Sequence, residues 1–199
     1  MNSRITAFFL LLVLGLGANR ALAGGIAGKV TAHGAKNGGD AIIYIEDANG
    51  KAFPAPSKHE HMDQKNMIFH PHVLPILQGT TVDFLNSDDV LHNVYCPDAC
   101  AGKFNLGSWP KGQTKSYTFT HAGCAATLLC NVHPEMQGFV FVVKTPYFAV
   151  SHADGSFEIK NVPPGTYTVH IWHEKLKGST VTVTVPASGN ATANFDIKR

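Results

Sequence analysis

Short runs of alternating apolar and polar residues extend along most of the chain. The clearest is Thr180–Val185, in which threonine and valine alternate without interruption. Successive side chains of a β-strand point to opposite faces, so we expect these valines to face a core and the threonines to face solvent. Similar runs, separated by Gly, Pro and Asn, predict an all-β protein, because no long stretch has the period of an amphipathic helix. They are Ala41–Glu46, Thr80–Phe84, Ser116–Thr120, Phe139–Val143, Thr166–Trp172 and Ala193–Ile197.

The beginning of the chain has the pattern of an export signal. Arg4 precedes an apolar run over residues 5–16, and Ala21-Leu22-Ala23 places small residues where a signal peptidase cuts. The pattern predicts a signal peptide over residues 1–23. Because the apolar run is short, we expect no membrane span after cleavage. The expected product is an exported, soluble protein, periplasmic in a bacterium, and disulfides are permitted there.

The charges argue against several kinds of partner. The sequence has 16 basic and 14 acidic residues, and the predicted leader removes Arg4 and Arg20 but no acid, which leaves 16 − 2 = 14 basic residues against 14 acidic ones. Neither a basic stripe nor an acidic block is present. We therefore expect no nucleic-acid partner and no anionic membrane partner.

A cluster of metal-ligand residue types occurs late in the chain. Cys130, His133 and Met136 lie three residues apart on one short segment, and His92 lies 38 positions before the cysteine, after a predicted strand and turn. A thiolate, two imidazoles and a thioether suit copper, because sulfur favours Cu(I) while imidazole also suits Cu(II). Pro134 stiffens the segment by fixing its φ. The set predicts one copper ion per chain.

This spacing resembles that of a known family. Residues from about 62 to 144 resemble the blue (type 1) copper proteins of the plastocyanin and amicyanin type, and the loop spacing is similar to that of amicyanin. The resemblance implies a cupredoxin fold, a Greek-key β-sandwich, with His92, Cys130 and His133 in the copper plane and Met136 axial. It also implies that Asn93 ties the two ligand loops together. The implied function is one-electron transfer with a redox protein partner such as a periplasmic dehydrogenase or a cytochrome c.

Other interpretations remain open at this point. Zinc also binds thiolate and imidazole, but a thioether is a poor zinc ligand and no further Cys-x-x-Cys or His-x-x-x-His pair completes a tetrahedral set. A copper storage or delivery protein would share these ligands without a dedicated redox partner. An enzyme would need an open coordination position and a substrate pocket, and the sequence offers no catalytic constellation. We therefore expect a protein that is not an enzyme.

The ligand loop also predicts a docking surface. His133 lies between Cys130 and Met136 and is the ligand that we expect at the surface, with Val132 and Pro134 around it as an apolar patch. Small apolar patches suit the brief contacts of electron transfer. Leu91, in contrast, is expected to pack against the loop.

A second β-sandwich is predicted around the copper domain. The 176 residues after the leader (199 − 23) are enough for one large or two small domains. Asp154-Gly155 and Pro163-Pro164-Gly165 are turns before alternating strands, and this region resembles the carboxypeptidase regulatory-like fold, a small transthyretin-like sandwich of the immunoglobulin kind. The segment from Tyr147 onward lacks opening strands, which the start of the mature chain can supply. We therefore predict a discontinuous sandwich of residues 24–54 and 146–199, with the copper domain inserted as residues 57–144. Two domains in series, divided near Thr145, are the alternative.

Three cysteines remain once Cys130 is assigned to the metal. If strands lead away from the copper end at about 3.3 Å per residue, Cys124 lies at a height between Cys96 and Cys100. We favour a Cys100–Cys124 disulfide, because Cys100 lies in a turn that can bend toward a partner and Cys96 continues an inward alternation. A Cys96–Cys124 bond is a close second.

Additional histidines leave open a second metal site. Candidate ligands outside the copper motif are His59, His61, Met62, His70 and His72. The simpler interpretation is that these residues belong to polar connections and turns, and it is the one that we favour.

Overall fold

The computed structural model describes residues 24–199, which form strands and one short 3₁₀ turn. The predicted all-β class is confirmed. The signal peptide over residues 1–23 lies outside the described residues and stays a prediction. Within residues 24–199, no helix is long and apolar enough to cross a membrane.

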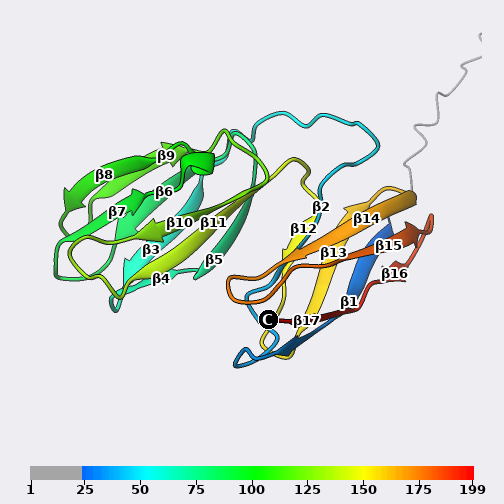
Figure 1. The fold of residues 1–199 in the computed structure, drawn as a ribbon. Helices are drawn as coiled ribbons and strands as arrows, with labels where there is room; N and C mark the ends of the chain where they lie inside the picture. The colour runs from blue at the N-terminus through cyan, green and yellow to red at the C-terminus, as the bar shows by residue number, and fades with distance from the viewer. Residues whose placement is uncertain (1–23) are drawn as a thin grey trace, which may run out of the picture.

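The strands form two β-sandwiches that lie side by side (Figure 1). The sandwich that we call inner, because it is central in the sequence, contains β3 to β11. Its sheets have the strand orders β5-β11-β10-β7-β8 and β4-β3-β6-β9. The strands are β3 (Glu60–Lys65), β4 (Ile68–His70), β5 (Val73–Leu77), β6 (Thr81–Asn86), β7 (His92–Cys96), β8 (Phe104–Trp109), β9 (Thr114–Thr118), β10 (Cys124–Leu129) and β11 (Gln137–Val143), with the 3₁₀ turn η1 at Ala99–Ala101.

Alternation explains why the inner sandwich closes around one core. Along β6 the side chains of Val82 and Phe84 are fully buried, whereas those between them are partly exposed. β10 has the same pattern, with Ala126 and Leu128 directed inward. Because both sheets contribute one apolar face, their strands bury those faces against each other. Trp109 and Phe119 complete this core.

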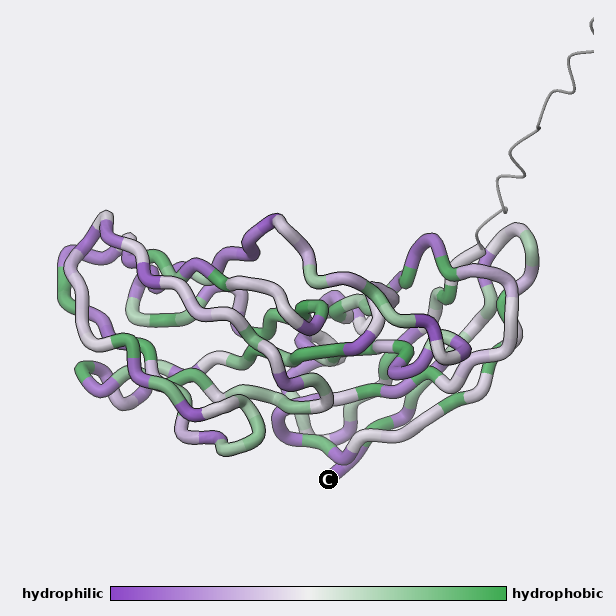
Figure 2. Tube along the Cα trace, turned by 90° about the horizontal axis from the view of Figure 1, so that it is seen from above, coloured by the Kyte–Doolittle hydropathy of each residue, from purple (hydrophilic) through white to green (hydrophobic). Residues whose placement is uncertain are grey.

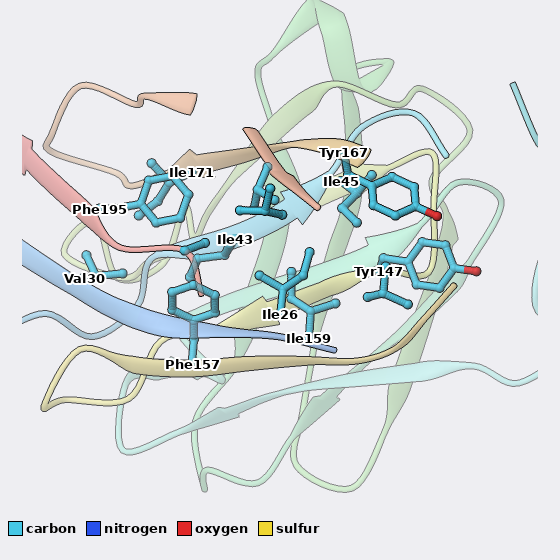
Figure 3. Close-up of a cluster of buried hydrophobic side chains, with 14 of the residues drawn as sticks. Ile26, Val30, Ile43, Ile45, Tyr147, Phe157, Ile159, Tyr167, Ile171 and Phe195 are labelled. Atoms are coloured by element: carbon cyan, nitrogen blue, oxygen red, sulfur yellow. The ribbon is translucent and has the colours of Figure 1, made fainter. Parts of the chain in front are cut away.

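The outer sandwich combines strands from both ends of the chain. β1 pairs antiparallel with β13 and parallel with β16 and β17, and the second sheet has the order β12-β2-β14-β15. Figure 3 shows its core, in which Ile26 and Ile43 from the beginning of the chain pack with Ile159 and Phe195 from its end. The strands are β1 (Gly24–His33), β2 (Ile42–Ile45), β12 (Phe148–Val150), β13 (Ser156–Val162), β14 (Gly165–Trp172), β15 (Thr180–Val185), β16 (Asn190–Thr192) and β17 (Phe195–Lys198).

Close packing against the end of the chain requires glycine at position 28 of β1. A Cβ atom at Gly28 would overlap the carbonyl oxygen of Ala193, which crosses the strand at close range. The backbone N–H of Ala193 donates to the carbonyl of Ala27 at 3.0 Å. Only glycine allows the end of the chain to approach the first strand so closely.

An apolar interface joins the two sandwiches. Phe139 and Phe141 on β11 contact Trp172 on β14, with ring centroids 5.4 and 5.5 Å apart, and Tyr44 on β2 lies 5.0 Å from Phe141. At one side His72 Nε2 lies 3.2 Å from the carboxylate of Glu174. The view from above shows the two sandwiches side by side and the change between hydrophobic and hydrophilic residues along their strands (Figure 2).

The strand pairings lead to a test of the predicted domain boundaries. Trypsin can cut after Lys58, an exposed residue in the connection that precedes β3. We expect the segment before the cut to stay bound to the rest of the chain on gel filtration, because its strands pair with β13 and β14. It should separate in denaturant. Release of this segment from the cut protein in native buffer would contradict the inserted arrangement.

Candidate metal centre

The pairing of β7 with β10 brings the distant ligand residues together. His92 is the first residue of β7, and Cys130 directly follows the last residue of β10. The strands are antiparallel, with Leu129 opposite Tyr95. The beginning of one strand therefore lies beside the end of the other, at one end of the inner sandwich.

Three donor atoms converge at this end. The ligand atoms of His92, Cys130 and His133 all lie within 4.8 Å of one another. Cys130 Sγ is 4.0 Å from His92 Nδ1 and 3.9 Å from His133 Nδ1, and the two Nδ1 atoms are 3.1 Å apart. Donors to one ion with bonds of about 2.0–2.3 Å lie at most about 4.3 Å from each other, so these side chains fit a single metal ion without rearrangement.

The centre is enclosed by protein. His92 is fully buried, and Cys130 is 2% exposed. Met136, the expected axial residue, is also fully buried and belongs to the same core cluster as Cys130. Its backbone N–H donates to the carbonyl of His133 at 3.0 Å, which closes the ligand loop into a turn. His133 alone of the three convergent residues is partly exposed.

Asn93 connects the two parts of the chain that carry the ligands. Its backbone N–H donates to Cys130 Sγ at 3.4 Å, and its side-chain oxygen accepts from the backbone N–H of Asn131 at 3.3 Å. The side-chain amide donates to Asn105 Oδ1 at 2.8 Å and to the carbonyl of Gly107 at 2.9 Å. These contacts hold the sulfur of Cys130 and the residue that follows it against the beginning of β7.

Asp88 orients the buried histidine, a role that the sequence analysis missed. His92 Nε2 lies 2.9 Å from the Asp88 carboxylate, so the Nε2–H donates and the lone pair of Nδ1 is directed at the site. The backbone N–H groups of Asn66 and Met67 donate to the same carboxylate, at 2.7 and 2.9 Å. Burial disfavours the charged form of Asp88, but the hydrogen bonds from Met67, His92 and Asn66 outweigh this effect and hold the pKa of the carboxyl below its ordinary value.

Exposed apolar side chains gather at this end of the inner sandwich. Every large apolar side chain that is exposed within residues 24–199 adjoins the centre, and their exposed fractions lie between 44% and 52%. Two of them precede His92, one precedes His133, and two lie at the turn whose N–H groups bind Asp88. The expectation that Leu91 packs against the loop was wrong, since it is the most exposed of the group. We call this group the apolar rim: Met67, Ile68, Val90, Leu91 and Val132.

The additional histidines do not form a second group with three convergent ligands. His59 Nδ1 and His61 Nδ1 lie 3.0 and 3.8 Å from opposite oxygens of Asp83. Met62 is fully buried in the core, because strand alternation directs it away from its neighbour His61. In the part of the chain that the structure describes, the set of His92, Cys130 and His133 is the one group of three His, Cys or carboxylate ligands whose atoms lie within 4.8 Å.

The remaining pair of that histidine set is also separated. His70 is exposed at the end of β4, next to Pro71, and His72 is bound to Glu174 across the sandwich interface. No donor beyond Glu174 completes a site around His72 within the described residues. The interpretation as connections and turns holds for His59 and His72, whereas His61 and Met62 belong to β3 and His70 ends β4.

The other cysteines lie apart from the centre. Cys100 and Cys124 form a disulfide, which is the pairing favoured from the sequence. Cys124 begins β10, whereas Cys130 follows its end, so the disulfide is at the opposite end of the strand. Cys96 is free and buried, and burial raises the pKa of its thiol to about 11. A thiol with such a pKa is a poor nucleophile and metal ligand at neutral pH.

Comparisons with known proteins give two results for the two parts of the chain. Residues 138–198 match the family of the carboxypeptidase regulatory-like domain. The solved structures that are similar to the chain are amicyanin and other cupredoxins, and they cover about half of it. No curated protein matches the sequence.

Three of these structures illustrate the extent of the likeness. An oxidised amicyanin variant is 29% identical, with 42% of this chain and 81% of that chain covered and a TM-score of 0.40. A reduced amicyanin variant is 28% identical, with 52% and 98% covered and a TM-score of 0.41. A purple cupredoxin from Nitrosopumilus maritimus is 26% identical, with 42% and 98% covered and a TM-score of 0.37.

The contacts of Asn93 predict a double effect of its replacement. Asn93→Ala should lower the free energy of unfolding by about 1–3 kcal/mol, because buried polar partners lose their hydrogen bonds. It should also speed the release of bound metal, because the loop at Asn131 loses its tie to β7. Denaturant unfolding and transfer of metal to a chelator measure the two effects.

Asn105→Ala is the matched control. Asn105 bonds Asn93 and the backbone of Gly107 but not the ligand loop. This variant should lose stability while keeping the rate of metal release. Equal rates of metal release in the Asn93 variant and the unchanged protein would show that the tie has no role at the centre.

Proposed function

We propose that this chain binds one copper ion in a type 1 site and carries single electrons between redox protein partners. His92, Cys130 and His133 would hold the ion as its strong ligands, with Met136 as a weaker fourth ligand. The convergence of one cysteine sulfur and two imidazole nitrogens at 3.1–4.0 Å from each other is the observation that carries the proposal. When bound, copper would supply the one-electron change between its cuprous and cupric states.

The donor set favours copper over zinc. A structural zinc site closes with four strong N, O or S ligands. Here the fourth residue at the loop is Met136, whose thioether is a weak ligand that suits copper sites with three strong ligands. The burial of His92 and Cys130 also favours an ion that stays in place, and this argues against a protein that hands its metal to others.

The protein groups limit rearrangement at the centre. Asp88 holds the Nε2–H of His92, and Asn93 holds both the sulfur of Cys130 and the loop that follows it. Since these contacts are present in the protein itself, the ligands have little freedom to follow a change in charge. A rigid ligand set keeps the reorganisation energy of electron transfer small.

The apolar rim supports docking of a redox partner. Val132 of the rim directly precedes His133, which is partly exposed and would bring the electron closest to the surface. Exposed apolar groups of this kind mark interaction sites, and a small contact suits a transient complex. A periplasmic dehydrogenase or cytochrome c remains the proposed kind of partner, and the periplasm the proposed location.

Metal titration tests the copper site. One equivalent of cupric ion should give an intense visible band from thiolate-to-copper charge transfer, and Cys130→Ser should abolish it. Cys96→Ser, which removes the other free thiol, should keep it. Met136→Leu should keep the colour and raise the reduction potential, because a weak axial donor is lost. A colourless unchanged protein, or a band that depends on Cys96, would disprove the site.

Electron self-exchange tests the carrier function without a known partner. Two copies must meet at the apolar rim for an electron to pass between their centres. Leu91→Lys should slow self-exchange at low ionic strength, because like charges then face each other. NMR line broadening in mixtures of the oxidised and reduced protein measures the rate.

Thr168→Lys is the control for this measurement, because it places the same charge at an exposed position of β14, in the outer sandwich. Its self-exchange rate should match that of the unchanged protein. Slow self-exchange in the unchanged protein, with the visible band intact, would favour storage or delivery of copper over electron transfer.

A further inference from the structure

β15 is an edge strand without the usual protection of strand edges. It ends the sheet β12-β2-β14-β15 and pairs with β14 alone. Natural edge strands carry charges, proline or bulges, or are very short, and these features prevent pairing with another chain. β15 has six residues, Thr-Val-Thr-Val-Thr-Val, with no charge, proline or glycine. Threonine and valine are both among the residues that are enriched in β-strands.

The other edges of both sandwiches do carry such features. β9 contains Lys115, β13 contains Glu158 and Lys160, and β5 contains Pro75. The pairing of β8 with β7 shifts its register. β4, β12 and β16 have three residues each. β15 therefore differs from the rest of the protein.

The pairing with β14 shows which backbone groups of β15 are free. The N–H of Ile171 donates to the carbonyl of Ser179 at 3.1 Å, so residues 171 and 179 are a hydrogen-bonded pair. Hydrogen-bonded and non-hydrogen-bonded pairs alternate along an antiparallel ladder. Because Val181, Val183 and Val185 follow residue 179 in steps of two, they bond to β14, and the threonines point their N–H and C=O groups to the open edge.

Two further observations agree with this assignment. Thr166 Oγ1 and Thr184 Oγ1 lie 3.0 Å apart, as expected for a non-hydrogen-bonded pair, whose side chains are the closer ones. In residues 24–199, no backbone hydrogen bond reaches the open edge from another segment. The three threonines are also exposed. The edge thus offers donors and acceptors at every second residue.

We propose that β15 pairs antiparallel with β15 of a second copy of this chain, with Thr182 on the twofold axis. In this register Thr180 lies opposite Thr184 of the copy, and Val181 lies opposite Val183. Each threonine then belongs to a hydrogen-bonded pair, which gives about six backbone hydrogen bonds across the axis. The threonine side chains of the two copies then lie opposite each other on the exposed face of the sheet. The valine side chains lie opposite each other on the face toward the core of the outer sandwich.

The sequence of β15 is self-complementary in this register, which favours a second copy over an unrelated strand. A strand of alternating Thr and Val keeps both faces matched when it is paired antiparallel with itself, and no like charges oppose. An isologous contact of this kind closes as a dimer and does not continue into a fibre. It joins two four-stranded sheets into one of 4 + 4 = 8 strands.

The dimer leaves the metal centres accessible. Trp172 and Tyr44 contact the inner sandwich through the same sheet face that carries Thr182. The twofold axis of an antiparallel pair is perpendicular to the sheet, so both inner sandwiches lie on one face of the joined sheet. The apolar rim is at the start of β7 and the end of β10, and neither strand takes part in the contact.

Sedimentation velocity of residues 24–199 over a range of concentrations tests the proposal. The unchanged chain should be a concentration-dependent dimer. Thr182→Lys should raise the dissociation constant by about tenfold or more, because two like charges then face each other on the axis. The N–H and C=O of Thr182 have no partner within the described chain and its side chain is exposed, so the variant should fold. Its unfolding curve checks this.

Thr168→Lys is the matched control, since Thr168 lies opposite Thr182 on β14 and is also exposed. Its charge is one strand further from the axis. The two introduced lysines of the dimer would therefore lie about 14 Å apart, and salt screens their repulsion at physiological ionic strength. This variant should dimerise as the unchanged chain does.

Charge reversal gives the most specific outcome. Thr182→Glu alone should raise the dissociation constant as Thr182→Lys does. A mixture of the Lys and Glu variants should form a heterodimer, because the two charges then attract. Low salt should strengthen this heterodimer. An unchanged chain that stays monomeric at the highest soluble concentration would overturn the proposal. So would a Thr182→Lys variant that dimerises like the Thr168→Lys control.

Discussion

The antiparallel pairing of β7 with β10 is the constraint on which the metal centre depends. It brings His92 to Cys130 across 38 positions of sequence, and the hydrogen bond from Asn93 to the sulfur lies at the point where the strands end. His133 and Met136 follow on the same short loop, so they need no further long-range contact. The core between the two sheets of the inner sandwich fixes the strands, and the strands in turn fix the donors. The protein thus holds the ligand side chains in position without a bound ion. Such a ligand set suits an ion that changes its oxidation state while its ligands keep their positions.

The outer sandwich stands at the other end of this arrangement. β11 begins at Gln137, beside the ligand loop, and ends at Val143, from which the chain enters the outer sandwich. The end of the inner sandwich that holds His92 and Cys130 is therefore opposite the end from which the chain enters the outer sandwich. Phe139 and Phe141 on the outer face of the same strand pack against the outer sandwich. One strand thus links the centre, the interface and the support. β15 is the edge of the sheet that packs against the inner sandwich, and the proposed contact along this edge involves neither β7 nor β10.

Much of this could be predicted from the sequence, because the relevant signals are local. Alternation identified the strands, and the ligand spacing identified the centre, since most of its ligands lie on a single loop. The sequence did not reveal Asp88, whose role depends on a turn that brings its carboxylate to Nε2 of His92. It also misplaced Leu91, because exposure at the end of a sandwich depends on which neighbouring loops cover that end. The sequence analysis kept Met62 as a possible ligand. Strand alternation places Met62 and His61 on opposite faces of β3, so the burial of Met62 could have been predicted. The free edge of β15 follows from strand order, which no local pattern gives.

The account depends on one sulfur and two ring nitrogens meeting at a single ion. X-ray absorption at the copper edge of the loaded protein measures this most directly, because it reports the atoms bound to the metal. The account predicts a shell with one short bond to sulfur and two bonds to imidazole nitrogen. A shell of nitrogen and oxygen alone, without sulfur, would contradict it.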